Sequence, residues 1–388
     1  MDLRLTEEQQ SLYDTAYKFA QKEWEPKTLE IDDENRFPLW LWDKLKENGW
    51  LGLLVPEEYG GAGLGLLETC LIMEAAVRAG GDVGSALTWG SHLTIGSVPI
   101  LTCGNEAQKE KYLPKLASGE WMSCFMLTEP NVGSDAAGVE TTAERKGDYY
   151  IVNGTKTFIT NAAKADVGML MASTDLSKKA KGITAFMVDM HSEGITIGEP
   201  FDKIGPRGSE QSEVHFNNVK VPVEDRILEE GEGFIKVGVT NLEFERTGLA
   251  SIWTGLQGYS IDLAVKYACE REQFGHKIAE FPQIRDRIAQ MRLEYDISKL
   301  LMYQAASKID NGEKGMLEST EYKVYNSQAC IRTALEAMQI FGGYSLIKEY
   351  KIERSLRDAK LSSIGAGSEQ MLLEIIARAT TGVRSMTF

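Results

Sequence analysis

The chain has 388 residues, of which 43% are hydrophobic, so it can bury the cores of roughly two or three domains, and a disordered scaffold is excluded. Asp and Glu number 57 against 42 Lys and Arg, and the net charge of -15 excludes the basic surface of a nucleic-acid-binding protein. An anionic ligand would therefore need local partners such as backbone N–H groups, helix N-termini or individual arginines.

The sequence carries no sign of export, membrane insertion or metal binding. Residues 1–8 show no basic stretch followed by an apolar one, and no apolar run approaches the roughly 18 residues of a membrane span. We therefore expect a cytoplasmic protein without membrane insertion. The four histidines are far apart, so no metal site is expected. The five cysteines lack C-x-x-C spacing and are expected to be buried, reduced thiols: Cys70, Cys103, Cys124, Cys269 and Cys330.

Helical patterns fill the first third of the chain, which predicts an N-terminal helical domain at residues 1–122. Thr6 and Gln9 have the spacing of a capping box ahead of an apolar stripe. Further helices are expected around residues 39–48, 67–79 and 105–117. The glycine cluster at residues 60–63 lacks G-x-G-x-x-G spacing and is interpreted as a connector without a ligand.

Residues 123–228 form the next segment, and their pattern changes to short β-rich runs separated by turns, which predicts a middle β-barrel or β-sandwich domain. The loop at 127–135 opens this domain. Its hydroxyls and turn formers suit it to offering backbone N–H groups to a phosphate or a polar ring edge, although an ordinary loop has the same composition. The expected strands include residues 149–152, 167–171, 182–188 and 214–216.

Helical periodicity returns after Gly233, which places a C-terminal helical domain at residues 229–388. Leucines recur at heptad spacing from Leu242 to Leu263, and further helices are expected at 285–310 and 316–341. Because helices and strands are segregated along the chain, the fold class is α+β. The segment Gln339–Tyr344 ends a helix with a glycine pair, which fits either a C-cap or close backbone approach to a ligand.

One carboxylate falls on an apolar helical stripe. Glu245 follows Ile235, Val239 and Leu242 and precedes Leu249 at helical spacing, so it occupies a core-facing position. Burial would raise its pKa toward a value useful for a general base near neutral pH. The alternative is an ion pair with an arginine of another helix, and the residues alone favour this alternative because buried acids are usually paired.

Five separated motifs, in this order, resemble those of the acyl-CoA dehydrogenase family, and the resemblance runs over essentially the whole chain. They are residues 128–135 (TEPNVGSD), 154–161 (GTKTFITN), 271–275 (REQFG), 339–343 (QIFGG) and 357–368 (RDAKLSSIGAGS).

The resemblance implies an N-terminal helical domain, a middle β domain and a C-terminal four-helix bundle, assembled as a homotetramer with one FAD per subunit. Residues expected to line the flavin, and partly the thioester, are Phe125, Leu127, Thr128, Ser134, Phe158, Ile159 and Thr160. Residues expected to reach the FAD of a neighbouring subunit are Arg271, Phe274, Gln339, Gly342 and Gly343, and cofactor contacts after the C-terminal turn are expected from Ser368 and Gln370.

The chain departs from the family at the turn that commonly carries a catalytic glutamate. Many members read Tyr-Glu-Gly-Thr there, whereas this chain has Gly365-Ala366-Gly367-Ser368, and an alanine cannot take a proton. The isovaleryl-CoA branch also shows Gly-Ala-Gly and supplies its base from the long helix, directly before an arginine. The resemblance therefore identifies Glu245 as the base and Arg246 as the supporting arginine. Pro282 and Tyr344-Ser345 are further departures at positions of usual flavin or turn contacts.

The implied activity is α,β-dehydrogenation of an acyl-CoA thioester, with electrons passed to an electron-transferring flavoprotein. Stabilising the enolate requires donors at the carbonyl oxygen. The resemblance implies that the backbone N–H of Ala366 is one of these donors. The small residues at the turn favour a branched or alicyclic acyl group, and His92 fits either the acyl tail or a structural role. A flavin-dependent oxidase or other flavin chemistry on the same fold is the alternative. Expected substrate contacts are Ser134, Leu242, Arg246, Gly365, Ala366 and Gly367.

Overall fold

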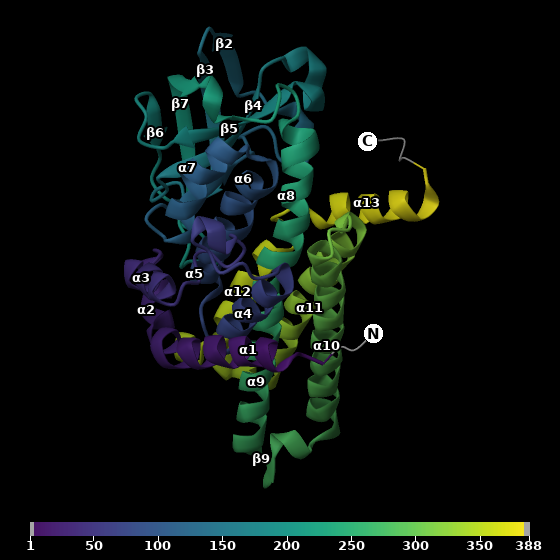
Figure 1. Ribbon diagram of the computed structural model, residues 1–388. Coiled ribbons are helices and arrows are strands. Elements are labelled where there is room, and N and C mark those ends of the chain that lie inside the picture. The colour runs from purple at the N-terminus through teal and green to yellow at the C-terminus, as the bar shows by residue number, and fades with distance from the viewer. Residues whose placement is uncertain (1–3, 384–388) are drawn as a thin grey trace.

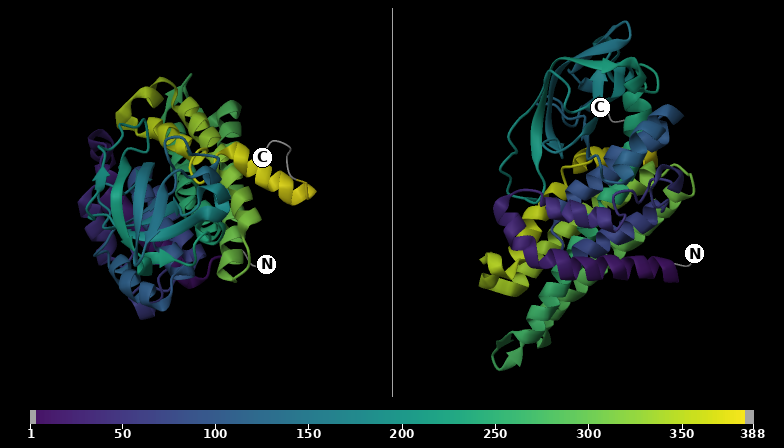
Figure 2. Two further views of the ribbon diagram at one scale, coloured as in Figure 1. Left: turned by 90° about the horizontal axis from the view of Figure 1, so that it is seen from above. Right: turned by 60° about the vertical axis from the view of Figure 1, so that its left-hand side comes forward.

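The computed structural model describes residues 4–383 and shows helices, then a β domain, then helices again along the chain (Figure 1). This order confirms the α+β fold class. Met1, Asp2 and Leu3 of the N-terminal segment lie outside the described residues. Figure 2 shows the β domain stacked on the helices rather than beside them.

The N-terminal part is helical, and its helices lie close to the expected positions. Thr6 Oγ1 accepts from Gln9 N, and Thr6 N donates to Gln9 Oε1, so the capping box is confirmed. α4 and α5 are almost wholly buried in the main core. The helices are α1 (Glu7–Phe19), α2 (Thr28–Glu34), α3 (Leu39–Glu47), α4 (Leu66–Arg78), α5 (Val83–Ser91), α6 (Val98–Cys103) and α7 (Glu106–Ala117).

The β domain is one mixed sheet in the order β6-β7-β3-β2-β4-β5-β8, with β1 parallel to β4. The pairing of β3 with β7 shifts register between Lys156 and Ile159, and this irregularity turns Phe158 out of the sheet with φ 57°. The strands are β1 (Ser123–Met126), β2 (Thr142–Lys146), β3 (Tyr149–Thr160), β4 (Val167–Ser173), β5 (Ile183–Asp189), β6 (Ile195–Ile197), β7 (Gln211–Pro222) and β8 (Arg226–Ile227).

The C-terminal part begins with a helix broken by wide turns. π-helical turns at Gly233–Gly238 and Glu245–Leu249 flank α8 (Val239–Phe244), and α9 (Ser251–Glu270) continues into the bundle. The other elements are the hairpin β9 (Glu272–Gln273) and β10 (His276–Lys277), and the helices α10 (Pro282–Asp310), α11 (Met316–Phe341), α12 (Ile352–Ser362) and α13 (Glu369–Thr381).

The prediction of a continuous buried apolar stripe is wrong for its first residues. Ile235 and Val239 are 45% and 39% exposed, whereas Leu249, Ile252 and Leu256 are buried. A π-turn holds an extra residue, so it shifts the helix face that follows it. The stripe therefore becomes part of the core only after Glu245.

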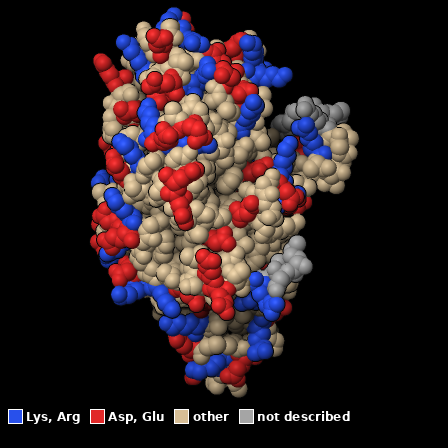
Figure 3. All heavy atoms as spheres, in the orientation of Figure 1, with Lys and Arg blue, Asp and Glu red and all other residues tan. Residues whose placement is uncertain are grey.

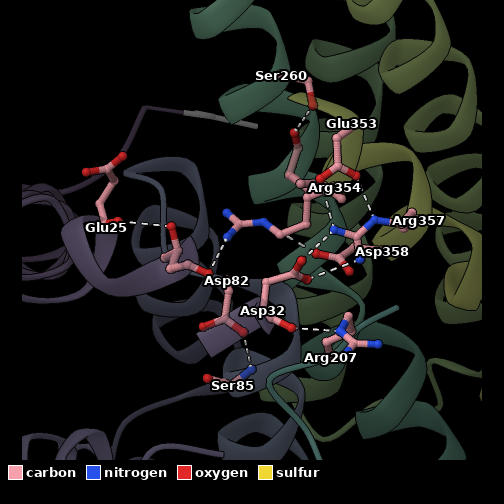
Figure 4. A network of polar contacts seen from close by, with 12 residues as sticks. Glu25, Asp32, Asp82, Ser85, Arg207, Ser260, Glu353, Arg354, Arg357 and Asp358 are labelled. Carbon is pink, nitrogen blue, oxygen red and sulfur yellow. Dashed lines mark hydrogen bonds and ion pairs between the residues drawn. The ribbon is translucent and has the colours of Figure 1, made fainter. Parts of the chain in front are cut away.

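A network of charged side chains fixes α12 against the other parts of the molecule (Figure 4). Arg357 donates to both carboxylate oxygens of Asp32 in α2, at 3.1 and 2.7 Å, and to Ile204 O at 2.7 Å. Arg207, in the loop before β7, donates to Asp32 O at 2.7 Å. Burial raises the pKa of Asp358 to about 7, although Arg354 and Arg357 oppose the shift. Because α12 runs directly into residues 363–368, this network positions that turn.

The cysteines are all unpaired, but the expectation that they are buried is wrong for Cys269, which is exposed near the end of α9. Cys103 is half-buried, and the other three are buried. Within residues 4–383, no helix is long and apolar enough to cross a membrane. The same range holds no cluster of three or more His, Cys, Asp or Glu side chains that could bind a metal ion.

Candidate functional site

Glu245 and Arg246 lie where the chain widens into a π-turn before α9. The Arg246 side chain is buried, and its Nε donates to Ala366 O at 3.1 Å. One of its terminal nitrogens donates to Thr320 Oγ1 at 3.2 Å on α11. Wide turns of this kind recur at functional sites because they re-aim side chains. Here the turn brings the Glu245–Arg246 pair to the segment after α12.

The residue 363–368 turn has an unusual backbone. Ala366 has φ 59°, a left-handed conformation that is costly for a residue with a Cβ, and Gly367 follows with φ 102°. A Cβ at Gly367 would lie 3.4 Å from an Arg246 nitrogen and 3.1 Å from Leu372 Cδ2. The Ala366 N–H donates to no acceptor among residues 4–383. The turn therefore presents a backbone donor close to the Glu245–Arg246 pair.

The electrostatic surroundings of Glu245 suit a proton acceptor. Burial raises the pKa of its carboxyl, while Arg246 and Lys323 pull it down. Within the described part of the chain, the carboxylate makes no hydrogen bond and no ion pair within 4 Å. The alternative of an ion pair with an arginine of another helix is therefore not realised. A carboxylate without a direct partner is free to accept a proton from a ligand.

A buried ion pair holds the loop that opens the β domain. Lys156 Nζ lies 2.6 Å from Glu129 Oε1 and donates to Leu127 O at 3.0 Å. Glu129 also accepts from Glu140 N at 2.6 Å and Thr141 N at 3.0 Å. The ion pair thereby fixes the backbone at Leu127.

The loop at residues 127–135 meets the C-terminal turn, and an exposed aromatic ring lies on β3 of the same domain. Ser134 Oγ lies 3.5 Å from Ser368 Oγ, at the start of α13. Phe158 is 61% exposed, and its ring lies 5.2 Å from that of Phe201. A Cβ added at Gly133 would meet no atom within 4 Å. Thr157 N, next to Phe158, donates to Thr128 O of the loop at 2.9 Å. An exposed aromatic ring on a strand bonded to an open loop is a setting in which a planar ring and its phosphates can bind.

Other residues expected in this group vary in their placement. Thr160 Oγ1 accepts from Gln211 Nε2 at 2.9 Å. Ile159 is 3% exposed and packs in the β-domain core, so only its backbone is available to a ligand. Phe125 and Leu127 pack partly against the core, Leu242 and Thr128 are partly buried, and Gln370 is exposed on α13.

The second group of expected cofactor residues lies elsewhere. Arg271, Phe274, Gly342 and Gly343 line one open groove of about 580 Å³. Gln339 is exposed in the last turn of α11, and its carbonyl accepts from Gly342 N, so the C-cap interpretation of this helix end is correct. Figure 1 places the neighbouring β9 at the opposite end of the molecule from the β domain. The two groups cannot line one cofactor within a single chain.

The structure shows the local role of two further residues, His92 and Pro282. His92 Nε2 lies 3.1 Å from Leu116 O and Nδ1 lies 3.0 Å from Ser123 Oγ, and burial lowers the pKa of His92 to about 4. His92 is therefore a structural histidine. Pro282 is the first residue of α10, where the missing N–H costs nothing.

Figure 3 shows acidic and basic side chains interspersed on the face that it draws, without a broad basic patch.

Three domain families match the chain in sequence order. The acyl-CoA dehydrogenase N-terminal domain matches residues 6–120, the middle domain residues 124–219 and the C-terminal domain residues 231–381.

Three relatives are similar over nearly the whole chain. The 3-(aryl)acrylate reductase of Clostridium sporogenes is 41% identical over 96% of this chain and 98% of its own. Subunit CarC of the caffeyl-CoA reductase-Etf complex of Acetobacterium woodii is 39% identical, with the same coverage of 96% and 98%. The mitochondrial isovaleryl-CoA dehydrogenase of Pongo abelii is 39% identical over 97% of this chain and 89% of its own.

Solved structures share the fold over its full length. Butyryl-CoA dehydrogenase from Megasphaera elsdenii superposes with a TM-score of 0.95 at 36% identity, covering 98% of this chain and 100% of that one. The FAD complex of PigA superposes with a TM-score of 0.94 at 30% identity, covering 98% and 99%.

Proposed function

The chain belongs to the acyl-CoA dehydrogenase family, and from this we propose that it dehydrogenates an acyl-CoA thioester between the α and β carbons, with FAD as its cofactor. One observation carries the proposal. Glu245, a carboxylate without a direct partner, lies beside an arginine that holds the turn carrying a free Ala366 N–H. The proposed acyl group is branched or alicyclic and of short or medium length.

The residues at the first group fit a flavin. Phe158 offers an exposed ring, Gly133 leaves open space at the loop, and Ser134 and Ser368 offer hydroxyls across the junction of loop and turn. Thr128 and Thr160 would add polar contacts from the β domain. When bound, FAD would supply the two-electron acceptor that side chains lack, and it would take the hydride that leaves the β carbon. The similarity to the FAD complex of PigA supports this cofactor.

In the proposed reaction, Glu245 takes the α-proton of the thioester. Ala366 N–H donates to the carbonyl oxygen, where negative charge develops as the proton leaves. Arg246 anchors Ala366 through its carbonyl oxygen, so the same peptide segment keeps its N–H in place. The absence of a large side chain at Gly365 and Ala366 leaves room for substituents near the α and β carbons.

The second group of cofactor residues is proposed to act from another copy, in the homotetramer that the family resemblance implies. Phe274 is 92% exposed at the far end of the bundle. On α10, Leu293 and Leu300 are 55% and 46% exposed, and their spacing of seven residues places them on one helix face. Exposed apolar surface of this kind supports contact with another protein chain. An electron-transferring flavoprotein is the proposed redox partner, supported by the Etf complex that contains CarC.

The reductase relatives favour a second candidate function. The 3-(aryl)acrylate reductase and the caffeyl-CoA reductase subunit are 41% and 39% identical to this chain. The same pair of residues, Glu245 and Ala366, would serve enoyl reduction, because a base in one direction is the acid in the other. In this candidate the substrate is an arylacrylyl thioester, and the reaction runs toward the saturated product. Reduced FAD would supply the hydride to the β carbon, and protonated Glu245 would supply the proton to the α carbon.

Anaerobic titration distinguishes the candidates. The protein purified with FAD is mixed without oxygen with straight, branched, cyclic and 3-aryl acyl-CoA esters, and the visible absorbance of the flavin is followed. Bleaching by a branched or alicyclic ester supports the first function. Reoxidation of the reduced protein by an arylacrylyl-CoA, with weak bleaching by saturated esters, supports the second. Rapid turnover with oxygen would indicate an oxidase, and no bleaching by any ester would contradict the proposal.

A further inference from the structure

Lys323, on α11, is a buried lysine at the site that sequence analysis does not single out. The residue is 1% exposed, and its ammonium makes no ion pair within 4 Å in the described part of the chain. An ammonium is costly to bury without a carboxylate partner. The buried ammonium therefore needs other polar partners that offset the cost of its burial.

The ammonium is bound at the end of α12. Lys323 Nζ donates to Ser362 O and lies 3.3 Å from Ser327 Oγ. Ser327 Oγ also donates to Ser362 O, at 2.7 Å. Carbonyl groups at a helix C-terminus lack partners within the helix and carry partial negative charge, so they favour a cation. Lys323 therefore caps the helix that leads into the residue 363–368 turn.

Two buried cations hold this turn, one directly before it and one within it. Lys323 holds Ser362 O before the turn, and Arg246 holds Ala366 O within it, at 3.1 Å. Ala366 keeps a left-handed φ of 59°, which persists only where the surroundings fix the backbone. Removing one of the two contacts would release one side of the turn.

The same two cations act electrostatically on Glu245. Arg246 comes from the same π-turn and Lys323 from α11, and both lower the pKa that burial raises. Glu243 of α8 faces Arg246, and Glu369 of α13 faces Lys323. Burial lowers the pKa of Lys323 to about 8, although Glu245 and Glu369 oppose this. The charges of Glu245 and Lys323 are thus coupled without a direct bond.

Building on the proposed role of Glu245, we propose that Lys323 is a positioning residue for the reaction. Its ammonium holds the turn through Ser362 O, and it supplies the second positive charge that keeps Glu245 ionised when substrate arrives. The Lys323 ammonium can have both effects because α11 contacts both α12 and the π-turn at Glu245.

The test compares pH profiles of kcat for holoenzyme variants, with flavin content measured for each. Lys323→Met removes the charge, and the acidic limb is expected to move to higher pH by about 1 unit, the shift caused by losing one opposite charge near a carboxylate. Ser327→Ala is the matched control. It removes a donor to the same Ser362 oxygen but no charge, so its acidic limb should stay at the wild-type pH.

Lys323→Arg keeps the test decisive if Lys323→Met does not fold. A guanidinium stays protonated at all accessible pH values. This variant keeps a positive charge beside Glu245, so its acidic limb should stay at the wild-type pH. A wild-type acidic limb in the folded Met variant, or an acidic limb in the Arg variant that moves to higher pH by about 1 unit, would overturn the proposal.

Failure of the proposed function is separable from failure of this inference. Glu245→Gln is assayed in parallel. If that variant turns over normally, Glu245 is not the base and the proposed function itself falls. If it is inactive while the acidic limb of Lys323→Met stays at the wild-type pH, only the role of Lys323 is rejected.

Discussion

Replacing Lys156 by methionine tests whether the buried ion pair sets the loop at the candidate site. The side chains of Lys156 and Glu129 are 0% and 2% exposed, and Nζ lies 2.6 Å from Oε1. In the variant, Glu129 keeps only the backbone donors of Glu140 and Thr141. Removing one partner of such a pair leaves a buried charge, and the expected loss in the free energy of unfolding is about 3–5 kcal/mol.

Urea unfolding at pH 7 measures this loss, and a matched surface variant provides the control. Lys146 pairs with Glu144, but their side chains are 50% and 67% exposed. Lys146→Met should therefore change the free energy of unfolding by less than about 1 kcal/mol. The Lys156 variant should also retain less FAD, because Lys156 holds Leu127 O. A loss at Lys156 no larger than that at Lys146 would refute the reasoning.

Three further predictions follow from the network at α12, the turn and the distant groove. The pKa of Asp358 is raised from 3.8 to about 7. Between these two pH values the folded protein binds a proton at Asp358 that the unfolded protein does not bind. The stability gained from this proton is therefore lost as pH rises through about 7. Asp358→Asn removes this pH-dependent stability. The free energy of unfolding of the variant minus that of the wild type should therefore rise by on the order of 2–4 kcal/mol between pH 5 and 8. Urea titrations measure this difference, and a difference that does not change with pH would contradict the raised pKa of Asp358. Glu245→Ala combined with Ala366→Glu should regain part of the turnover lost in Glu245→Ala alone, and no recovery would count against both positions addressing one carbon. Arg271→Ala should weaken FAD binding by roughly tenfold, the loss of one charge-assisted hydrogen bond, in fluorescence titrations of the apoprotein, whereas unchanged affinity would argue against a second copy at the cofactor.

The helices of the bundle were predictable because their ends carry local signals. The helix expected at 316–341 coincides with α11, which begins just after a glycine and ends at the glycine pair. α10 begins at Pro282 rather than near residue 285 because proline is suited to the first helical position. These boundaries depend on neighbouring residues, so sequence patterns suffice to place them.

The π-turns and Lys323 were missed for a different reason. The leucine spacing from Leu242 to Leu263 fits a regular helix, and nothing in it marks where a turn holds an extra residue. Lys323 looks like a solvent-facing lysine until its neighbours are considered. The stripe of small polar residues around it, Ser319, Thr320, Asn326 and Ser327, is buried, and such a stripe was the available signal of a polar contact with another helix. That helix, α12, is distant in sequence, so the contact depends on tertiary structure.

The most direct test of the account is exchange of the substrate α-proton. Glu245→Gln and Glu243→Gln are purified with FAD and incubated in D₂O with an acyl-CoA that bleaches the wild type, and deuterium at the α carbon is followed by mass spectrometry. Glu243 lies two residues away, and its carboxylate accepts from Gly315 N at 3.5 Å, so its variant is the matched control. The account predicts that Glu245→Gln keeps FAD but loses exchange and turnover, while Glu243→Gln exchanges normally. Undiminished exchange in Glu245→Gln would contradict it.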